Sequence, residues 1–145
     1  MTAGGGSDGE KSDGTVTDGA MANRSTDASA AGSPRFVHAA DVAWADLGGG
    51  VWRQILGHDA EMMMVRVRFD AGAVGAPHHH PHRQATLVES GRFRVEIGGE
   101  TRELGAGDGF FIPPNVEHGV VATEAGVLVD VFTPARADFL GKAAR

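Results

Sequence analysis

Two histidines and a glutamine form the clearest chemical pattern in this sequence. His78 and His80 are separated by one residue, and Gln84 follows four residues after His80. Residues i and i+2 of a strand point to the same face, so both imidazoles can reach one metal ion from a rigid support. Gln84 is placed to bring an amide oxygen beside them. The spacing predicts a metal site.

A second segment brings a further histidine toward this site. The turn residues Pro113, Pro114 and Asn115 stand shortly before His118. Proline and asparagine favour turns, and asparagine tolerates the left-handed conformation better than most residues. We therefore expect the chain to turn here, so that His118 approaches the same ion from a neighbouring strand.

The absence of cysteine restricts the chemistry of the site. The chain of 145 residues has no cysteine, which excludes disulfides, thiolate zinc sites, iron–sulfur clusters and a cysteine nucleophile. One divalent metal ion held by nitrogen and oxygen is the expected cofactor. Nickel, zinc, iron, manganese and cobalt all suit imidazole and amide ligands, so the pattern leaves the identity of the metal open.

Charge and hydropathy exclude several classes of partner. The net charge is −6, and lysine and arginine are not clustered, whereas a nucleic-acid surface needs a positive patch. No apolar stretch approaches the ~18 residues of a membrane span, and the N-terminal segment lacks the apolar block of a secretory signal. We expect a cytoplasmic protein with a small-molecule partner, and neither nucleic acid nor membrane.

Composition divides the chain near residue 34. Residues 1–34 are mostly Gly, Ser, Thr, Asp and Ala, and such a segment buries too little apolar surface to offset the entropy of ordering. We predict a disordered N-terminal tail over residues 1–34 and one domain over residues 35–145.

The domain has the pattern of an all-β protein. Glycine and proline separate short runs rich in Val, Phe and Ile, which is typical of an antiparallel sandwich or barrel. A Gly98-Gly99 pair predicts a tight hairpin turn, and residues 135–144 predict a short C-terminal helix. The expected strands are Val51 to Leu56, Met62 to Phe69, Gln84 to Glu89, Arg92 to Ile97, Phe110 to Ile112, His118 to Thr123 and Val127 to Thr133.

The histidine segments resemble the two motifs of the cupin family, with fifteen residues between them. The residues that carry this resemblance are Gly72, His78, His80, Gln84, Gly91, Gly107, Pro113, Asn115 and His118. The resemblance covers about residues 50–140 and implies a double-stranded β-helix barrel, or jelly roll, with a metal ion near its lumen. It implies four ligands, and two positions open to water or substrate: the ligands are His78, His80, Gln84 and His118.

Gln84 stands where cupins more often have glutamate. A neutral amide leaves the ion with nearly its full double charge, which disfavours a ferric state. We therefore expect Lewis-acid chemistry rather than oxygen activation.

The last predicted strand carries a second group of candidate residues. Leu128, Asp130 and Phe132 alternate with valines and so share one face. A carboxylate on an otherwise apolar face is costly to bury unless it has a partner or a task.

This ending, together with the run His80-Pro81-His82-Arg83-Gln84, is similar to the KdgF-type pectin-degradation cupins. Those proteins open the ring of 4,5-unsaturated uronate monosaccharides to the linear 5-keto form, and they are commonly homodimers. The resemblance implies substrate contacts by Asp130, Phe132 and Arg136. We expect Asp130 to transfer protons, Arg136 to bind the sugar carboxylate and Phe132 to pack against the sugar.

Each of these assignments has a structural alternative. The histidine-rich run could be an exposed loop, and Arg136 could pair with Asp138 instead of a substrate. Asp130 could be a structural hydrogen-bond acceptor, and Phe132 could belong to the core.

Other functions also fit the sequence. We expect Arg83 and Leu87 beside the pocket, where related proteins commonly have other residue types, so the substrate can differ from a pectin or alginate monomer. The competing functions are a metal-dependent cupin dioxygenase and a noncatalytic cupin that binds a small molecule. Ring opening of unsaturated uronates in polyuronate catabolism is the leading prediction.

Overall fold

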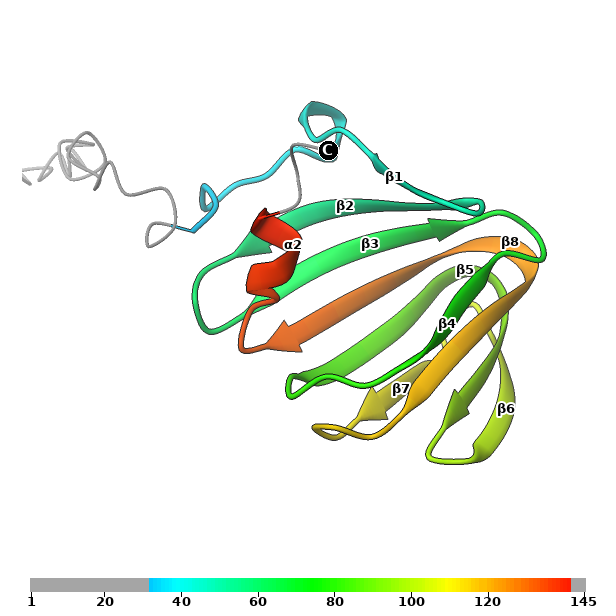
Figure 1. Cartoon of the computed structure of the whole chain (residues 1–145). Coiled ribbons are helices and arrows are strands. Elements are labelled where there is room, and N and C mark those ends of the chain that lie inside the picture. The colour runs from blue at the N-terminus through cyan, green and yellow to red at the C-terminus, as the bar shows by residue number, and fades with distance from the viewer. Residues whose placement is uncertain (1–31, 142–145) are drawn as a thin grey trace, which may run out of the picture.

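The computed structural model describes residues 32–141, which form a strand-rich fold (Figure 1). The predicted disordered tail lies outside the described residues, except for its last three positions. The strands are β1 (Ala45–Gly48), β2 (Val51–His58), β3 (Met63–Phe69), β4 (Val74–His78), β5 (Arg83–Ile97), β6 (Glu100–Gly105), β7 (Gly109–Ile112) and β8 (His118–Thr133). A 3-10 turn, η2 (Ala39–Asp41), precedes them and the helix α2 (Ala137–Gly141) follows.

All strands pair antiparallel in one sheet that contains eight strands. Its main order is β1-β2-β3-β8-β5-β6, with β4 added to β8 and β7 added to β5. The first half of β5 pairs with the second half of β8, and the remaining halves also pair with each other. These two long strands therefore run through both layers of the fold, which confirms the predicted all-β jelly roll.

The two longest strands were each expected as two separate strands. Residues 84–89 and 92–97 lie in the single strand β5, and residues 118–123 and 127–133 lie in β8. The β5–β8 register shifts between Val88 and Phe93, where the chain bulges. A bulge bends a strand without ending its pairing. Gly91 and Gly126, which separate the expected strands, therefore lie at bends within β5 and β8.

Three strands have no counterpart among the expected ones, namely β1, β4 and β6. Most of their residues are exposed and few are large and apolar, so they lack the alternation that marks a half-buried strand. The predicted hairpin turn joins β5 to β6: Ile97 pairs with Glu100, and Gly98 and Gly99 have φ of 56° and 86°. That turn is confirmed.

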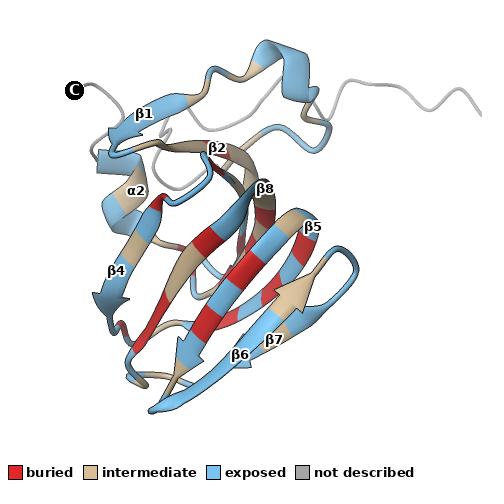
Figure 2. Ribbon diagram, turned by 90° about the vertical axis from the view of Figure 1, so that its right-hand side faces the viewer, coloured by how far each residue is buried: buried red, intermediate tan, exposed pale blue. Residues whose placement is uncertain are grey.

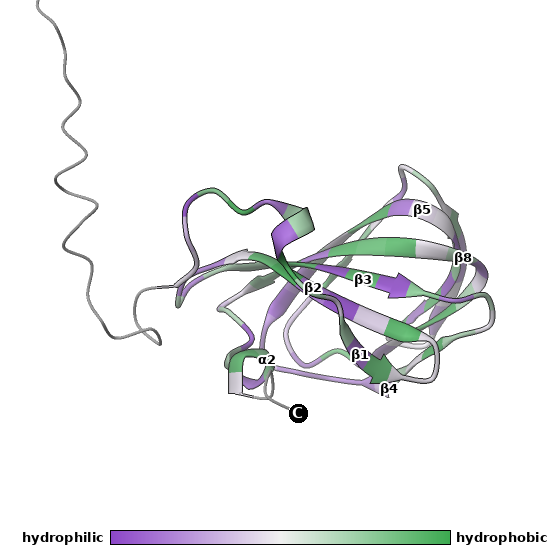
Figure 3. Cartoon of the chain, turned by 90° about the horizontal axis from the view of Figure 1, so that it is seen from above, coloured by the Kyte–Doolittle hydropathy of each residue, from purple (hydrophilic) through white to green (hydrophobic). Residues whose placement is uncertain are grey.

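The core lies between the layers, and burial alternates along the strands. In Figure 2 buried and exposed segments alternate along β5, and Figure 3 shows the matching change between hydrophilic and hydrophobic residues. Phe93 and Val95 point inward, whereas Arg94 and Glu96 point outward. Phe69 meets Phe93 edge to face at 5.3 Å between ring centroids. This alternation of buried and exposed side chains confirms the pattern predicted for residues 92–97.

The C-terminal helix is shorter than the expected range of residues 135–144. It spans Ala137–Gly141, and residues 142–145 lie outside the described part. The backbone N–H of Ala135 donates to the carbonyl of Ala60 at 3.2 Å. The ring of Phe139 meets that of Phe132 edge to face, so α2 is attached to the end of β8. Within residues 32–141, no helix has the length and apolar character needed to cross a membrane.

The ordered contacts begin slightly before residue 35. The Ser33 backbone N–H donates to the carbonyl of His58 at 2.8 Å, and the Ser33 hydroxyl oxygen accepts from the backbone N–H of His58 at 2.9 Å. Ser33, inside the predicted tail, thus pairs with the end of β2.

Candidate metal centre

Three histidines converge from segments that are far apart in the sequence. His78 ends β4, His118 begins β8, and these two residues face each other in the β4–β8 register. His80 lies in the loop after β4, so it does not share a strand with His78 as expected. Ring nitrogens of the three residues lie within 4.8 Å of one another, a separation that allows them to hold one metal ion.

Each imidazole is oriented by a backbone carbonyl that accepts a hydrogen bond from Nδ1. With the proton on Nδ1, the lone pair of Nε2 is left free to bind a metal. Hydrogen bonds of this kind orient the ligands in known metal sites. The distances are 2.9 Å from His78 to Ala76 O, 3.0 Å from His80 to His82 O and 2.9 Å from His118 to Val116 O.

The state of His118 fits a metal ligand. Its Nε2 is buried and has no hydrogen-bond partner among the described residues. Burial lowers the pKa of His118 to about 4 and also lowers the pKa of His80, so both rings are neutral near pH 7. A neutral imidazole is the metal-binding form, and leaving a buried nitrogen unpaired costs about 1–3 kcal/mol. The residues present therefore fit a bound metal ion.

The Gln84 side chain presents its oxygen to this cluster. Its Nε2 donates to Thr86 Oγ1 at 3.0 Å and to Asp130 Oδ1 at 3.3 Å, which fixes the orientation of the amide. Its Oε1 lies 3.0 Å from His80 Nε2. When His80 carries its proton on Nδ1, its Nε2 and the Oε1 of Gln84 both present lone pairs. Two such atoms close together can bind one cation.

Asp130 is buried next to the cluster. It faces Thr86 across the β5–β8 register, and the Thr86 hydroxyl donates to Asp130 Oδ1 at 2.6 Å. Burial raises the pKa of Asp130 to about 6, against the opposing effect of hydrogen bonds from Thr86 and Gln84. Among the described residues both hydrogen bonds to this carboxyl use Oδ1. Oδ2 is then the oxygen left to meet a ligand.

A cavity of about 200 Å³ adjoins the histidines. Most of the predicted site residues line it, together with apolar residues such as Val67 and Leu128. The predicted residues that line it are His78, Gln84, His118, Asp130, Phe132 and Arg136. His80 lies beside the wall, with its ring 5.7 Å from that of Phe132.

Arg136 lines the cavity but is already paired. Its Nε and Nη2 donate to the two carboxylate oxygens of Asp138 at 3.0 and 2.9 Å. This pairing is the structural alternative considered for Arg136, and it holds the pKa of Asp138 below its ordinary value. The Arg136 guanidinium also lies 5.1 Å from the centre of the Phe132 ring.

Two residues that sequence reasoning missed adjoin the site, and two that it expected there are absent. Arg53 on β2 lines the cavity, and Thr86 holds Asp130. The alternation of Arg53 with Val51 and Ile55 places a charge on an apolar face and could have revealed it. Arg83 and Leu87 are exposed on the outer face of β5, opposite to Gln84.

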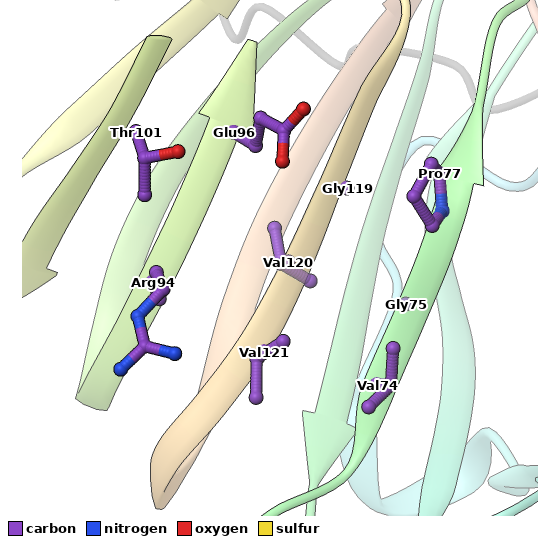
Figure 4. A pocket seen from close by; sticks show the side chains of 9 residues that line it. All are labelled: Val74, Gly75, Pro77, Arg94, Glu96, Thr101, Gly119, Val120 and Val121. Atoms are coloured by element: carbon purple, nitrogen blue, oxygen red, sulfur yellow. The ribbon is translucent and has the colours of Figure 1, made fainter. Parts of the chain in front are cut away.

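A smaller hollow of about 110 Å³ lies elsewhere, on the outer side of the sheet (Figure 4). Arg94 and Glu96 line one side, and Val74, Gly75 and Pro77 line the other. Its lining contains no histidine, so it offers no comparable group of metal ligands.

Comparisons with known proteins agree with this architecture. A family model described as "Cupin domain" matches residues 65–132. The pectin degradation protein KdgF of Dickeya dadantii (strain 3937) is 46% identical over 102 residues, which cover 69% of this chain and 93% of that protein.

Two solved structures have the same fold and substantial sequence identity. An RmlC-like cupin from Shewanella frigidimarina NCIMB 400 is 44% identical, with a TM-score of 0.73 over 74% of this chain and 97% of that one. KdgF from Halomonas sp. is 40% identical, with a TM-score of 0.71 over 74% of this chain and 99% of that one.

Proposed function

Because the chain belongs to the cupin family and is closely similar to KdgF proteins, we propose that it is a metal-dependent enzyme of polyuronate catabolism. It opens the ring of 4,5-unsaturated uronate monosaccharides to the linear 5-keto form. The observation that carries this proposal is the cluster of three histidines beside the buried carboxyl of Asp130; His78 and His118 line the same cavity as Asp130.

The metal site of the proposed enzyme consists of His78, His80, Gln84 and His118. The free Nε2 of His118 and the inward amide oxygen of Gln84 support this assignment. A divalent ion bound there acts as a Lewis acid on the oxygens of the sugar. Its identity stays open among nickel, zinc, iron, manganese and cobalt.

Asp130 is the proposed acid and base. Ring opening removes the proton of the anomeric hydroxyl as the bond between C1 and the ring oxygen breaks. The ring oxygen then becomes the C5 keto oxygen while C4 gains a proton, so the reaction is an isomerisation without a co-reactant. A carboxyl with a pKa of about 6 has both protonation states accessible near neutral pH, as such transfers require.

Arg136 and Phe132 are the proposed substrate contacts. The Nη1 edge of Arg136 is not used by Asp138, and we assign it a hydrogen bond to the sugar carboxylate. Phe132 presents its ring at the cavity wall, where it packs against the sugar. A cytoplasmic location, as the sequence analysis expects, and a homodimer, which the resemblance implies, complete the proposal.

The proposed function is tested by NMR with freshly generated unsaturated galacturonate and mannuronate. We expect the purified protein to speed the loss of the cyclic monomer. Asp130→Asn should reduce the rate by roughly 10²- to 10⁴-fold, the usual contribution of general acid–base catalysis. The exposed Asp41→Asn serves as the matched control and should retain the rate.

Metal content separates loss of catalysis from loss of the site. Elemental analysis should show the same metal content in Asp130→Asn as in the unchanged protein. If the unchanged protein does not speed ring opening of either uronate, the proposal is wrong. Stoichiometric oxygen uptake with a substrate would instead favour a dioxygenase.

A further inference from the structure

The cavity contains a second arginine that the proposed roles leave unused. We propose that Arg53 determines the specificity of the pocket for acidic sugars: together with the free Nη1 edge of Arg136 it binds the substrate carboxylate, and it supplies a positive charge that no direct ion pair neutralises. This inference rests on the proposed function of the same site, because it names the group that recognises the acid.

The strand β2 directs Arg53 into the cavity. Val51 and Ile55, two residues before and after it, pack against the hydrophobic core, and residues two apart share a face of a strand. Gln54 points to the other face, where its Nε2 donates to the carbonyls of Ala39 and Val42 at 2.7 and 2.8 Å. Arg53 is therefore an inward charge on an otherwise apolar face.

Arg53 forms no direct ion pair among the described residues, although Asp138 lies near enough to stabilise its charge in part. Within residues 32–141 the ion pairs involve three other arginines, namely Arg66, Arg102 and Arg136. The Arg53 guanidinium carbon lies 3.8 Å from the centre of the Phe139 ring. Stacking covers the face of a guanidinium but leaves the N–H groups at its edge available, and these match a carboxylate in two-pronged geometry.

Arg136 contributes less net charge to the same region. It lies 4.2 Å from the centre of the same Phe139 ring, yet its charge is balanced by Asp138. The other acid of the cavity is Asp130, which forms no ion pair among the described residues and whose Oδ1 accepts hydrogen bonds from Thr86 and Gln84. Arg53 is thus the cation at this pocket whose charge an anionic ligand would balance.

Burial makes the charge of Arg53 costly to maintain without a direct partner. Burial lowers the pKa of Arg53 from its ordinary value, and the nearby Arg136 acts in the same direction, whereas the carboxylate of Asp138 opposes the shift. A charge held in this way gains from a carboxylate partner. Galacturonate and mannuronate derivatives carry such a group, whereas the corresponding neutral sugars do not.

The test measures binding of a nonreacting acid and a matched neutral sugar. Purified metal-loaded protein is titrated with saturated galacturonate and with galactose, and binding is followed by NMR. We expect the unchanged protein to prefer the acid, and Arg53→Met to weaken acid binding at least tenfold while galactose binding is unaffected. Arg53→Lys should recover part of the preference, because it restores the charge without the planar fork.

The exposed Arg102→Met is the matched control and should retain the preference for the acid. A melting curve of each variant identifies any loss of folding caused by removing the stack on Phe139. If folded Arg53→Met keeps the preference, or if the unchanged protein has none, the inference is wrong.

Kinetics separate this inference from the proposed function. If the protein opens the uronate ring, Arg53→Met should raise KM at least tenfold with a smaller effect on kcat, since the carboxylate that Arg53 binds neither forms nor loses a bond in the reaction. A KM within twofold of the original would overturn the role of Arg53 and leave the enzyme intact. If no ring opening occurs but the acid preference depends on Arg53, the proposed function fails and the role of Arg53 stands.

Discussion

At each of the three histidines, a hydrogen bond on one ring nitrogen determines what the other nitrogen can do. The Nδ1 atoms of His78, His80 and His118 donate to backbone carbonyls, so the protein itself selects the tautomer that exposes Nε2. This selection is complete without a metal ion. The site is therefore preorganised by the backbone that surrounds it.

The first prediction concerns His118, the most buried of these histidines. His118→Ala should remove most of the bound metal, because it deletes a ligand whose Nε2 has no other partner among the described residues. The loss in affinity should exceed the roughly 10- to 100-fold typical of outer partners of metal ligands. Elemental analysis after dialysis measures the loss.

The matched control for this prediction is His79→Ala. His79 lies in the same histidine-rich run but is exposed and outside the cluster, so it should leave metal content unchanged. If His118→Ala held as much metal as the control, the proposed metal site would be wrong.

Single residues were predictable where their chemistry was unusual for their position. The histidine spacing and the acid on the apolar face of residues 128–132 pointed to His78, His118 and Asp130. Arg53 was missed because a lone arginine in a strand is normally on the solvent face. Arg83 was expected beside the pocket but lies on the outer face of β5. Neighbouring residues of a strand face opposite ways, so Arg83 points away from the side on which Gln84 lies.

At the scale of elements, the two long strands explain why strand limits were harder to predict than strand existence. Propensity identifies the apolar runs of β5 and β8, but glycine within a run signals either a turn or a bulge. Only the pairing of strands across the sheet distinguishes a turn from a bulge. The edge strands β1, β4 and β6 had no such runs, and backbone pairing alone defines them.

The second prediction tests the bend in β5. Gly91 has φ of 79°, and a Cβ atom there would lie 2.5 Å from the carbonyl oxygen of Ala125 and 2.7 Å from Cα of Gly126. Gly91→Ala should therefore reduce the free energy of unfolding by the cost of a left-handed residue, about 1–2 kcal/mol. A backbone clash should add roughly 1–3 kcal/mol. Urea denaturation measures both.

Gly72→Ala isolates the conformational part of that cost. Gly72 has a similar φ of 82°, but a Cβ atom there would have no neighbour within 4 Å. It should therefore be the milder substitution. Equal losses in the two variants would mean that the β5–β8 crossing is not tightly packed.

At the scale of the whole molecule, the site exists only because distant segments meet at one end of the fold. β4 and β8 supply His78 and His118, β5 supplies Gln84, and β2 supplies Arg53. The cupin motifs predicted the first three from sequence, since their spacing is a property of that fold. The alternation along β2 could place Arg53 on the inner face, but no short-range pattern links β2 to the other strands, so its position beside the histidines required the three-dimensional structure.

The third prediction concerns the boundary of the domain. Removal of residues 1–31 should leave the melting temperature and metal content unchanged, because that composition offers little apolar surface to bury. Removal of residues 1–34 should lower the melting temperature by a few degrees, because Ser33 exchanges hydrogen bonds with the backbone of His58. Each such bond contributes about 1 kcal/mol, and 1 kcal/mol shifts the melting temperature of a domain of this size by roughly 4 °C.

Thermal denaturation of the two shortened chains measures the difference. A large loss on removing residues 1–31 would show that the domain begins earlier, and equal melting temperatures for both chains would show that Ser33 contributes nothing to stability.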